Sequence, residues 1–365
     1  MSIAPESRSS AAFHECPAAE FPATEHTDCT DDCRLSPGVS IAPPNQDVGV
    51  KKSLAASSAR RQRDDQLRVA PVSVHRSYDG SNIVFRLLRM ETWGPALMNL
   101  GYHTFRGPLA FLNLAANLEL AQRRLVIRAV DLLDIGTQHN VLDIACGRGK
   151  SSFIVHCLFP QATVVGMDLL KHNVQVAQTL FDQIDNLSYI AGDATQIDFP
   201  DDSFDRVLCL EAAFHFPDRV RFLREACRVL RPGGRLIVVD FAWNTEADRR
   251  HREDPETRLV RGIWQWNDLF SVAEYERAAD DSGFEMLSRR DWSPHVTRPI
   301  QRIFQCLSTL GNSHWGRRFL LWKNPLYRSF SQADWQNVAS AVRAHDHVHR
   351  YSKYMAFVFE KRRTP

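Results

Sequence analysis

Three aspartates, Asp143, Asp168 and Asp193, lie at or near the carboxyl ends of apolar segments that are typical of buried strands. Such ends meet at one edge of a parallel sheet, so the three carboxylates are expected along one ligand-binding cleft. Asp168 ends the second segment, where a carboxylate can accept hydrogen bonds from ribose hydroxyls. Asp193 follows the third segment and is expected near an adenine edge. The pattern predicts an α/β sheet that binds a nucleoside.

The turn after the first segment indicates which kind of nucleoside. Gly147 and Gly149 let the backbone approach a ligand without interference from a Cβ atom, and Lys150 opens a helix. The third small residue that dinucleotide-binding turns carry is missing. Asp143 stands four residues before the first glycine, where a carboxylate would repel a pyrophosphate and could hold an ammonium group. These features favour a nucleoside that carries an amino acid over NAD.

Five motifs in a fixed order give the sequence a family resemblance. They are VLDIACGRG at 141–149, VVGMDLL at 164–170, AGDA at 191–194, FDRVLCLEAAFHF at 204–216 and RPGGRLIVVDF at 231–241. The chain resembles the class I S-adenosylmethionine-dependent methyltransferases that act on small molecules, among them natural-product O-methyltransferases and sterol-type C-methyltransferases. The resemblance implies S-adenosylmethionine as cofactor. It also implies an α/β fold with a doubly wound, mostly parallel, seven-stranded, Rossmann-like sheet whose last strand is antiparallel.

Transferred onto the matching positions, the resemblance also implies a set of cofactor-binding residues. These are Tyr78, Asp143, Ala145, Gly147, Gly149, Asp168, Leu169, Asp193, Ala194 and Glu211. Tyr78 and Tyr102 resemble tyrosines that close over cofactor and substrate in such enzymes, and packing in an ordinary helical core is the alternative. Glu211 is expected to be either a cofactor-side carboxylate or a structural anchor.

His215 is the candidate catalytic residue, as a general base, because it follows the fourth strand at the edge where the reactive methyl group is expected. A packed or substrate-contacting histidine that moves no proton is the alternative. A second group, His345, His347 and His349, is expected to be exposed on a lid, with metal binding as the weaker alternative. No metal site is predicted.

Composition divides the chain into four segments. Residues 1–70 are rich in Pro, Ser, Ala, Asp and Thr, and are predicted to be a disordered tail. Residues 71–120 are expected to form a helical cap, and residues 121–245 the cofactor-binding core with alternating strands and helices. Residues 246–365 are expected to hold lid helices, a substrate-binding insert before the last strand, and the last two strands.

Charge and tryptophan placement restrict the partners. The formal net charge is +2 with mixed signs, which disfavours nucleic acid. No apolar run is long enough to span a bilayer and no signal peptide is evident, so we expect no membrane partner and a cytoplasmic location. Seven of eight tryptophans stand at position 243 or beyond, which suits lids over a lipophilic or aromatic small molecule. The sequence does not indicate the oligomeric state.

The sequence therefore predicts transfer of a methyl group to a hydroxyl of a lipophilic or aromatic small molecule, in secondary metabolism. A C-methyltransferase acting on a terpenoid or sterol-like substrate is one alternative. A protein that binds S-adenosylmethionine without turnover is the other.

Overall fold

Seven strands of the computed structural model form one sheet in the order β3-β2-β1-β4-β5-β7-β6. The structure describes residues 82–90, 97–105, 118–267 and 269–363. The strands are β1 (Asn140–Ile144), β2 (Thr163–Asp168), β3 (Leu187–Ala191), β4 (Phe204–Leu210), β5 (Leu230–Trp243), β6 (Phe284–Asp291) and β7 (Ser352–Lys361). Only β7 runs antiparallel to its neighbours, β5 and β6. The predicted doubly wound, mostly parallel sheet with an antiparallel last strand is confirmed.

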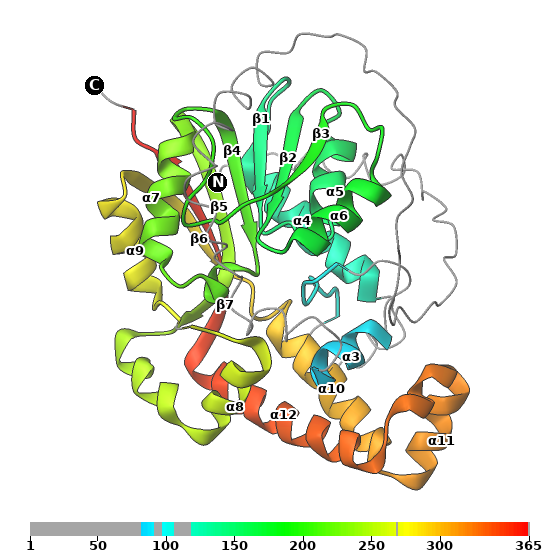
Figure 1. Cartoon of the computed structure of the whole chain (residues 1–365). Coiled ribbons are helices and arrows are strands. Elements are labelled where there is room, and N and C mark those ends of the chain that lie inside the picture. Colours follow the sequence, from blue (N-terminus) through cyan, green and yellow to red (C-terminus); the bar gives the residue numbers. More distant parts are fainter. Residues whose placement is uncertain (1–81, 91–96, 106–117, 268, 364–365) are drawn as a thin grey trace, which may run out of the picture.

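Helices cover both faces of this sheet because its central strands are apolar on both sides. One face packs against α4 (Leu118–Leu133), α5 (Lys150–Leu158) and α6 (Lys171–Leu180), and the other against α7 (Arg219–Val229) and α9 (Val272–Asp281) (Figure 1). Neighbouring strand residues point to opposite faces: Val141 packs in the first core and Leu142 in the second. The site-bearing turns therefore project from a sheet that is buried on both faces.

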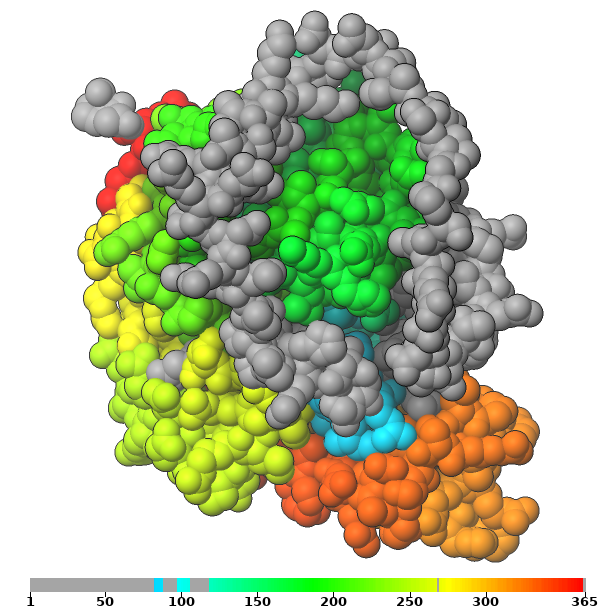
Figure 2. Space-filling view, viewed as in Figure 1, coloured from blue at the N-terminus to red at the C-terminus, as the bar shows by residue number. Residues whose placement is uncertain are grey.

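A third core holds the lid together. It is built by α10 (Thr297–Gly311), α11 (His314–Lys323) and α12 (Gln332–Tyr351), with α3 (Ile83–Met90) and the 3₁₀ helix η6 (Pro325–Ser329) packed on them. Trp335, 1% exposed, lies at its centre. The insert predicted before the last strand is thus a helical unit (Figure 1), and it has an apolar interior of its own. Figure 2 shows its outer surface in orange.

The segment after β5 is divided into two short helices. It forms a 3₁₀ helix, η5 (Glu246–Glu253), followed by α8 (Pro255–Trp264). Pro255 stands at the first position of α8, where its missing N–H costs nothing, and it cannot continue the preceding helix. The break turns α8 toward α12, against which it packs.

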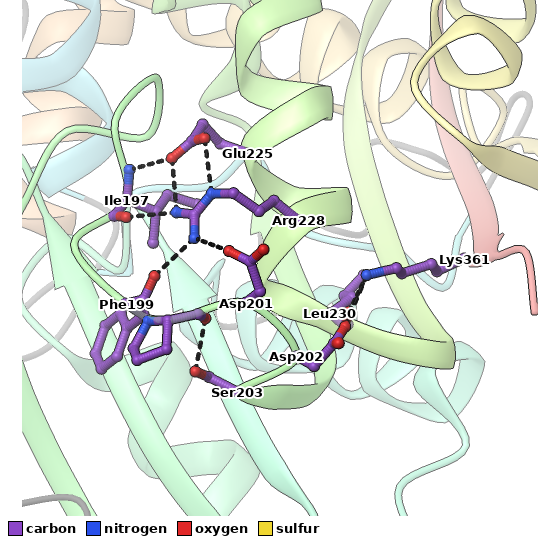
Figure 3. A network of polar contacts seen from close by, with 10 residues as sticks. Ile197, Phe199, Asp201, Asp202, Ser203, Glu225, Arg228, Leu230 and Lys361 are labelled. Carbon is purple, nitrogen blue, oxygen red and sulfur yellow. Dashed lines mark hydrogen bonds and ion pairs between the residues drawn. The ribbon is translucent and has the colours of Figure 1, made fainter. Parts of the chain in front are cut away.

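Arg228 of α7 fixes the loop between β3 and β4. Its guanidinium donates to the carbonyl oxygens of Ile197 and Phe199 at 2.7 and 2.8 Å and pairs with Asp201 at 2.8 Å. Glu225, one turn earlier on α7, accepts from Arg228 at 2.9 Å and from the Ile197 N–H at 2.9 Å (Figure 3). The loop that begins with the AGDA motif is thereby held in place at its far end.

Several expectations fall on parts of the chain outside the described residues. The tail 1–70 and Tyr78 lie there, as does most of the cap predicted for 71–120. Among the helices that are described, none is long and apolar enough to cross a membrane.

Candidate functional site

The turn after β1 forms the floor of a cleft at the carboxyl edge of the sheet. Ala145, Gly147 and Gly149 all have positive φ angles, of 58°, 57° and 85°. A Cβ atom on Gly149 would lie 2.7 Å from the Tyr189 ring, which explains why this position is a glycine. Gly149 also precedes the first residue of α5, so the turn leads directly into a helix N-terminus. Residues 145–148 line the cleft together with 97–99 of the cap.

Asp168, the last residue of β2, holds this turn. Its Oδ2 accepts the Gly147 N–H at 2.9 Å, and its Oδ1 accepts from Leu170 N at 2.9 Å and Asn173 Nδ2 at 3.1 Å. Burial raises the pKa of Asp168, while these three donors lower it. The carboxylate is thus fixed between the first two strand ends. Oδ2 accepts only one hydrogen bond and keeps a second lone pair for a ligand.

Asp143 lies under the turn and does not line the cleft. Its Oδ2 accepts from the hydroxyls of Ser151 and Ser152, at 2.6 and 2.7 Å. Burial raises the pKa of Asp143 to about 6. Ser151 does line the cleft, so in this geometry Asp143 acts on the cleft through the start of α5. Direct contact between Asp143 and an ammonium group stays a prediction.

The third aspartate is oriented by its own loop. Asp193 Oδ1 accepts from Thr195 N and from Thr195 Oγ1, both at 2.8 Å. Ala194 beside it is buried, whereas Leu169 is 40% exposed directly after β2. Contact of Leu169, Asp193 and Ala194 with the adenine ring stays a prediction.

Glu211 is a structural anchor at the end of β4. It has a positive φ of 49°, an unusual conformation for a residue with a side chain. Its carboxylate accepts the Leu100 N–H at 3.0 and 3.2 Å and the hydroxyl of Tyr354 on β7. Burial raises the pKa of Glu211 to about 7. These contacts are those of a structural anchor, and the cap segment that Glu211 holds lines the cleft. Contact between Glu211 and the cofactor stays a prediction.

His215 ends a 3₁₀ turn, η4 (Ala213–His215), that follows β4. Burial lowers the pKa of His215 to about 4, so its ring is neutral near pH 7. Arg219 of α7 holds the turn, since its Nε donates to Ala213 O at 2.8 Å and lies 3.6 Å from Asp240 Oδ2 on β5. Both members of this ion pair are buried.

A larger apolar pocket adjoins the cleft. It contains about 770 Å³ of empty space, part of it open to solvent. Its aromatic lining is Phe85, Phe214, Phe241, Trp264, Trp266 and Phe304. Phe214 faces this pocket, whereas His215 is not among the residues that line it. Leu97, Met98 and Asn99 line both the cleft and the pocket, so the two spaces share a wall.

The expectation that the histidines of α12 are exposed lid residues is wrong, because all three are half-buried. His345 and His349, one helical turn apart, line the apolar pocket. Nε2 of His345 accepts from Trp264 at 2.7 Å and its Nδ1 donates to Ala341 O at 2.7 Å, which fixes a neutral tautomer. Nδ1 of His349 is buried and has no hydrogen-bond partner among the described residues. Burial lowers the pKa of His349 to about 3.

His347 points away from that pocket. Its Nε2 lies 2.8 Å from Asp254 Oδ2, and His251 Nδ1 lies 2.8 Å from the same oxygen. Arg250 Nε donates to His251 Nε2 at 3.2 Å, so His251 carries its proton on Nδ1 and donates it to Asp254. The hydrogen-bonded cluster joins η5 and α8 to α12.

Comparison with known proteins identifies the family. Residues 142–238 match the family described as "Methyltransferase domain". The chain is 32% identical to methyltransferase GfsG of Streptomyces halstedii over 49% of its length and 64% of that protein. It is 33% identical to the 27-O-demethylrifamycin SV methyltransferase of Amycolatopsis mediterranei over 51% of its length and 68% of that protein. The chain belongs to the S-adenosylmethionine-dependent methyltransferases.

Other relatives of this methyltransferase differ in acceptor atom and in extent. It is 32% identical to sterol 24-C-methyltransferase erg6 of Aspergillus fumigatus, over 41% of each chain. A solved structure titled as a putative sarcosine dimethylglycine methyltransferase from Galdieria sulphuraria has the same fold, with a TM-score of 0.60 at 16% identity over 77% of this chain and 98% of that one. The chain spans between about two fifths and two thirds of the length of the three curated relatives named here.

The cleft of the methyltransferase fits S-adenosylmethionine. Residues 145–148 of the turn line the cleft, and Asp168 and Asp193 stand at or just after the next two strand ends. The first turn of α5 faces the cleft through Lys150 and Ser151, and a helix N-terminus favours a carboxylate such as that of the methionine moiety. The assignment of single residues to parts of the cofactor stays a prediction.

Sequence reasoning missed most of the residues around the apolar pocket of the methyltransferase. Tyr102, predicted as a closing residue, instead stacks on His295 with ring centroids 4.3 Å apart and lines neither space. Gln122 and Trp266 do line the pocket, and each has one buried polar atom with no partner among the described residues, Oε1 and Nε1 respectively. The spacing of His345 and His349 by four residues was the signal that could have placed them on one buried helix face.

Proposed function

We propose that this methyltransferase transfers a methyl group to a hydroxyl of a lipophilic or aromatic small molecule of secondary metabolism. The observation that carries the proposal is the shared wall: Leu97, Met98 and Asn99 separate the cofactor cleft from the aromatic-lined pocket. Methyl transfer needs donor and acceptor side by side and in line, and alignment alone can lower the barrier by about 7 to 11 kcal/mol.

The pocket lining supports an acceptor that is largely apolar with a few polar groups. Aromatic rings from α3, η4, β5, α8 with the residues just after it, and α10 surround it. Three buried polar atoms of the pocket lining have no hydrogen-bond partner among the described residues: Gln122 Oε1, Trp266 Nε1 and His349 Nδ1. Because unsatisfied buried polar atoms are costly, these three are suited to bond a hydroxyl or carbonyl of a bound acceptor.

S-adenosylmethionine supplies an electrophilic methyl group on sulfur. The chain must align the hydroxyl, exclude water and take up the hydroxyl proton. That proton becomes strongly acidic as the oxygen bonds to carbon, so a weak, neutral imidazole is sufficient to accept it. His215 remains the candidate from the sequence, and His349 is a second candidate because it lines the pocket.

Methylation of carbon on a terpenoid or sterol-like acceptor is the alternative, and the sterol C-methyltransferase among the relatives favours it. An apolar pocket serves such a substrate equally well. A protein that binds the cofactor without turnover remains the third possibility.

Incubation with trideuteromethyl-labelled S-adenosylmethionine and fractionated lipophilic extracts separates these readings. We expect a product that gains one labelled methyl group on oxygen, located by mass-spectrometric fragmentation and NMR. A label on carbon would establish the alternative. Cofactor binding by calorimetry with no labelled product from any fraction would support the non-catalytic reading.

A further inference from the structure

Helix α11 and the following η6 turn expose large apolar side chains to solvent. Trp315 is 78% exposed, Phe319 46%, Trp322 80% and Leu326 54%. We call these four residues, with the exposed Arg318, Lys323 and Arg328 among them, the aromatic-basic patch. The orange surface of this region forms the lower right of the molecule in Figure 2.

The solvent-facing side of α11 is apolar, whereas that of a surface helix is ordinarily polar. Its inner face is already packed, because Gly316 and Leu320 are buried against the rest of the lid. A helix that packs on one side normally turns charged and polar residues to water on the other. Trp315, Phe319 and Trp322 instead follow the spacing of a second apolar stripe, on the outside. Contiguous exposed apolar surface of this kind marks an interaction site.

Trp315 and Trp322 are far more exposed than the other tryptophans that the structure describes. Trp243, Trp266, Trp292 and Trp335 are each at most 6% exposed. Packing in the sheet core accounts for Trp243, Trp266 and Trp292, and packing in the lid for Trp335, which leaves Trp315 and Trp322 unexplained. Tryptophan has an apolar body and a polar N–H, a combination that suits a boundary between water and hydrocarbon.

The charge around the patch has one sign. Residues 292–333 contain no Asp or Glu, and six basic residues: Arg298, Arg302, Arg317, Arg318, Lys323 and Arg328. The Arg318 guanidinium lies 5.8 Å from the centre of the Trp315 ring, so cation and aromatic face are presented together. The rest of the chain has mixed signs and the whole has a formal net charge of only +2, so this segment is a local concentration of positive charge.

We propose that the aromatic-basic patch docks on the surface of an anionic phospholipid bilayer. Trp315, Phe319 and Trp322 would lie among the headgroups, and the basic side chains would contact lipid phosphates. A second copy of this chain is a poor occupant, because two such faces would bring like charges together. The proposal replaces the expectation of no membrane partner, which rested on the absence of a spanning segment and does not address attachment to a surface.

The patch lies on the outer side of the same lid that lines the apolar pocket. Ile300, Gln301 and Phe304 of α10 line that pocket, and α11 packs on α10 (Figure 1). Docking through α11 would bring the lid close to a phase in which lipophilic molecules concentrate. The docking itself does not depend on methyl transfer and can be tested without any methyl acceptor.

The test uses the full chain and vesicles of phosphatidylcholine with about 30% phosphatidylglycerol, compared with vesicles of phosphatidylcholine alone. We expect co-sedimentation with the anionic vesicles, a blue shift of tryptophan fluorescence, and weaker binding at high salt. The double variant Trp315→Ala/Trp322→Ala should bind at least about tenfold more weakly, and Arg318→Gln/Lys323→Gln should also lose affinity. Arg221→Gln/Arg224→Gln on α7 is the matched control, with two exposed arginines removed elsewhere, and should bind like the wild type.

Absence of binding to anionic vesicles at low salt would overturn the proposal, as would equal binding by the tryptophan variant. Sedimentation velocity without lipid provides a further check. A wild-type dimer that the tryptophan variant abolishes would make the patch a contact between copies and the bilayer proposal wrong. Equal melting temperatures of variant and wild type would show that lost vesicle binding is not lost folding.

Discussion

Both carboxylate oxygens of Glu211 accept the backbone N–H of Leu100, at 3.0 and 3.2 Å. The bond joins the end of β4 to the cap segment whose residues 97–99 separate cleft from pocket. The hydroxyl of Tyr354 on β7 also donates a hydrogen bond to the Glu211 carboxylate. Glu211 therefore connects the sheet, the last strand and the wall between the two ligand spaces.

Replacing Glu211 by Gln should change how stability depends on pH. Burial raises the pKa of Glu211 to about 7 from 4.5, so between these values the folded protein holds a proton that the unfolded chain releases. The contribution of Glu211 is therefore fully present below about pH 4.5 and is lost as the pH rises to about 7, by an amount on the order of 3 kcal/mol. Glu211→Gln cannot release this proton and should lack that decline.

Urea denaturation at a series of pH values measures the effect. The difference in unfolding free energy between wild type and Glu211→Gln isolates this group from other titrations. Glu285→Gln, at an exposed position on β6, is the control and should show the wild-type profile. Parallel profiles for wild type and Glu211→Gln would mean that Glu211 is ionised throughout.

Removing the carboxylate of Asp168 should weaken cofactor binding. Asp168→Ala removes the proposed ribose acceptor and also the bond that holds Gly147, so affinity for S-adenosylmethionine should fall by about 1.5 to 3 kcal/mol. Asn173→Ala deletes only one donor to Asp168 and should cost less. Titration calorimetry compares the three proteins. Unchanged affinity in Asp168→Ala would exclude this residue from the site.

The fold was predictable because its signals are local. Apolar strands, their terminal aspartates and the glycine turn are contiguous in sequence, and each implies the same parallel sheet. Even there, the sequence did not show that the Asp143 carboxylate would accept hydrogen bonds from Ser151 and Ser152. Which donors reach a buried carboxylate depends on how the following helix packs against the strand, and the sequence does not show that packing.

The apolar pocket was not predictable in the same way because its wall is assembled from distant segments. Gln122, Phe241 and His349 meet there from three different elements, separated by more than 100 residues in each step. No local pattern encodes such a meeting. The sequence also predicted that His349 is exposed on a lid, because the alternating histidines stand just before the last strand. In the structure α12 places His345 and His349 on one face and His347 on another.

The buried ion pair between Arg219 and Asp240 should be costly to break. Arg219→Met leaves the Asp240 carboxylate buried without its cation and frees the Ala213 carbonyl, so we expect a loss of roughly 3 to 5 kcal/mol in stability. Arg219→Met/Asp240→Asn should recover part of it. Arg350→Met, which breaks an exposed pair with Asp346, should change stability by less than about 1 kcal/mol. Equal losses in the two single variants, by urea denaturation, would refute this ranking.

The last prediction concerns which histidine accepts the proton. His215→Ala and His349→Phe each remove one imidazole, and phenylalanine preserves the stacking of residue 349 on Phe241. The variant that lacks the base should turn over about 10²-fold more slowly or worse, with nearly unchanged cofactor affinity. Because His349 lines the pocket and His215 does not, we expect the larger loss in His349→Phe.

The pH profile distinguishes a base from a positioning residue. Burial lowers the pKa of His215 to about 4 and that of His349 to about 3, and a ring accepts a proton only above its pKa. Wild-type turnover should therefore hold through pH 6 and fall only as the pH approaches these values, well below the ordinary histidine range. Glu211, whose pKa is near 7, would instead produce a change around neutrality. Normal turnover with flat profiles in both variants would mean that alignment alone drives the transfer and that neither histidine is a base.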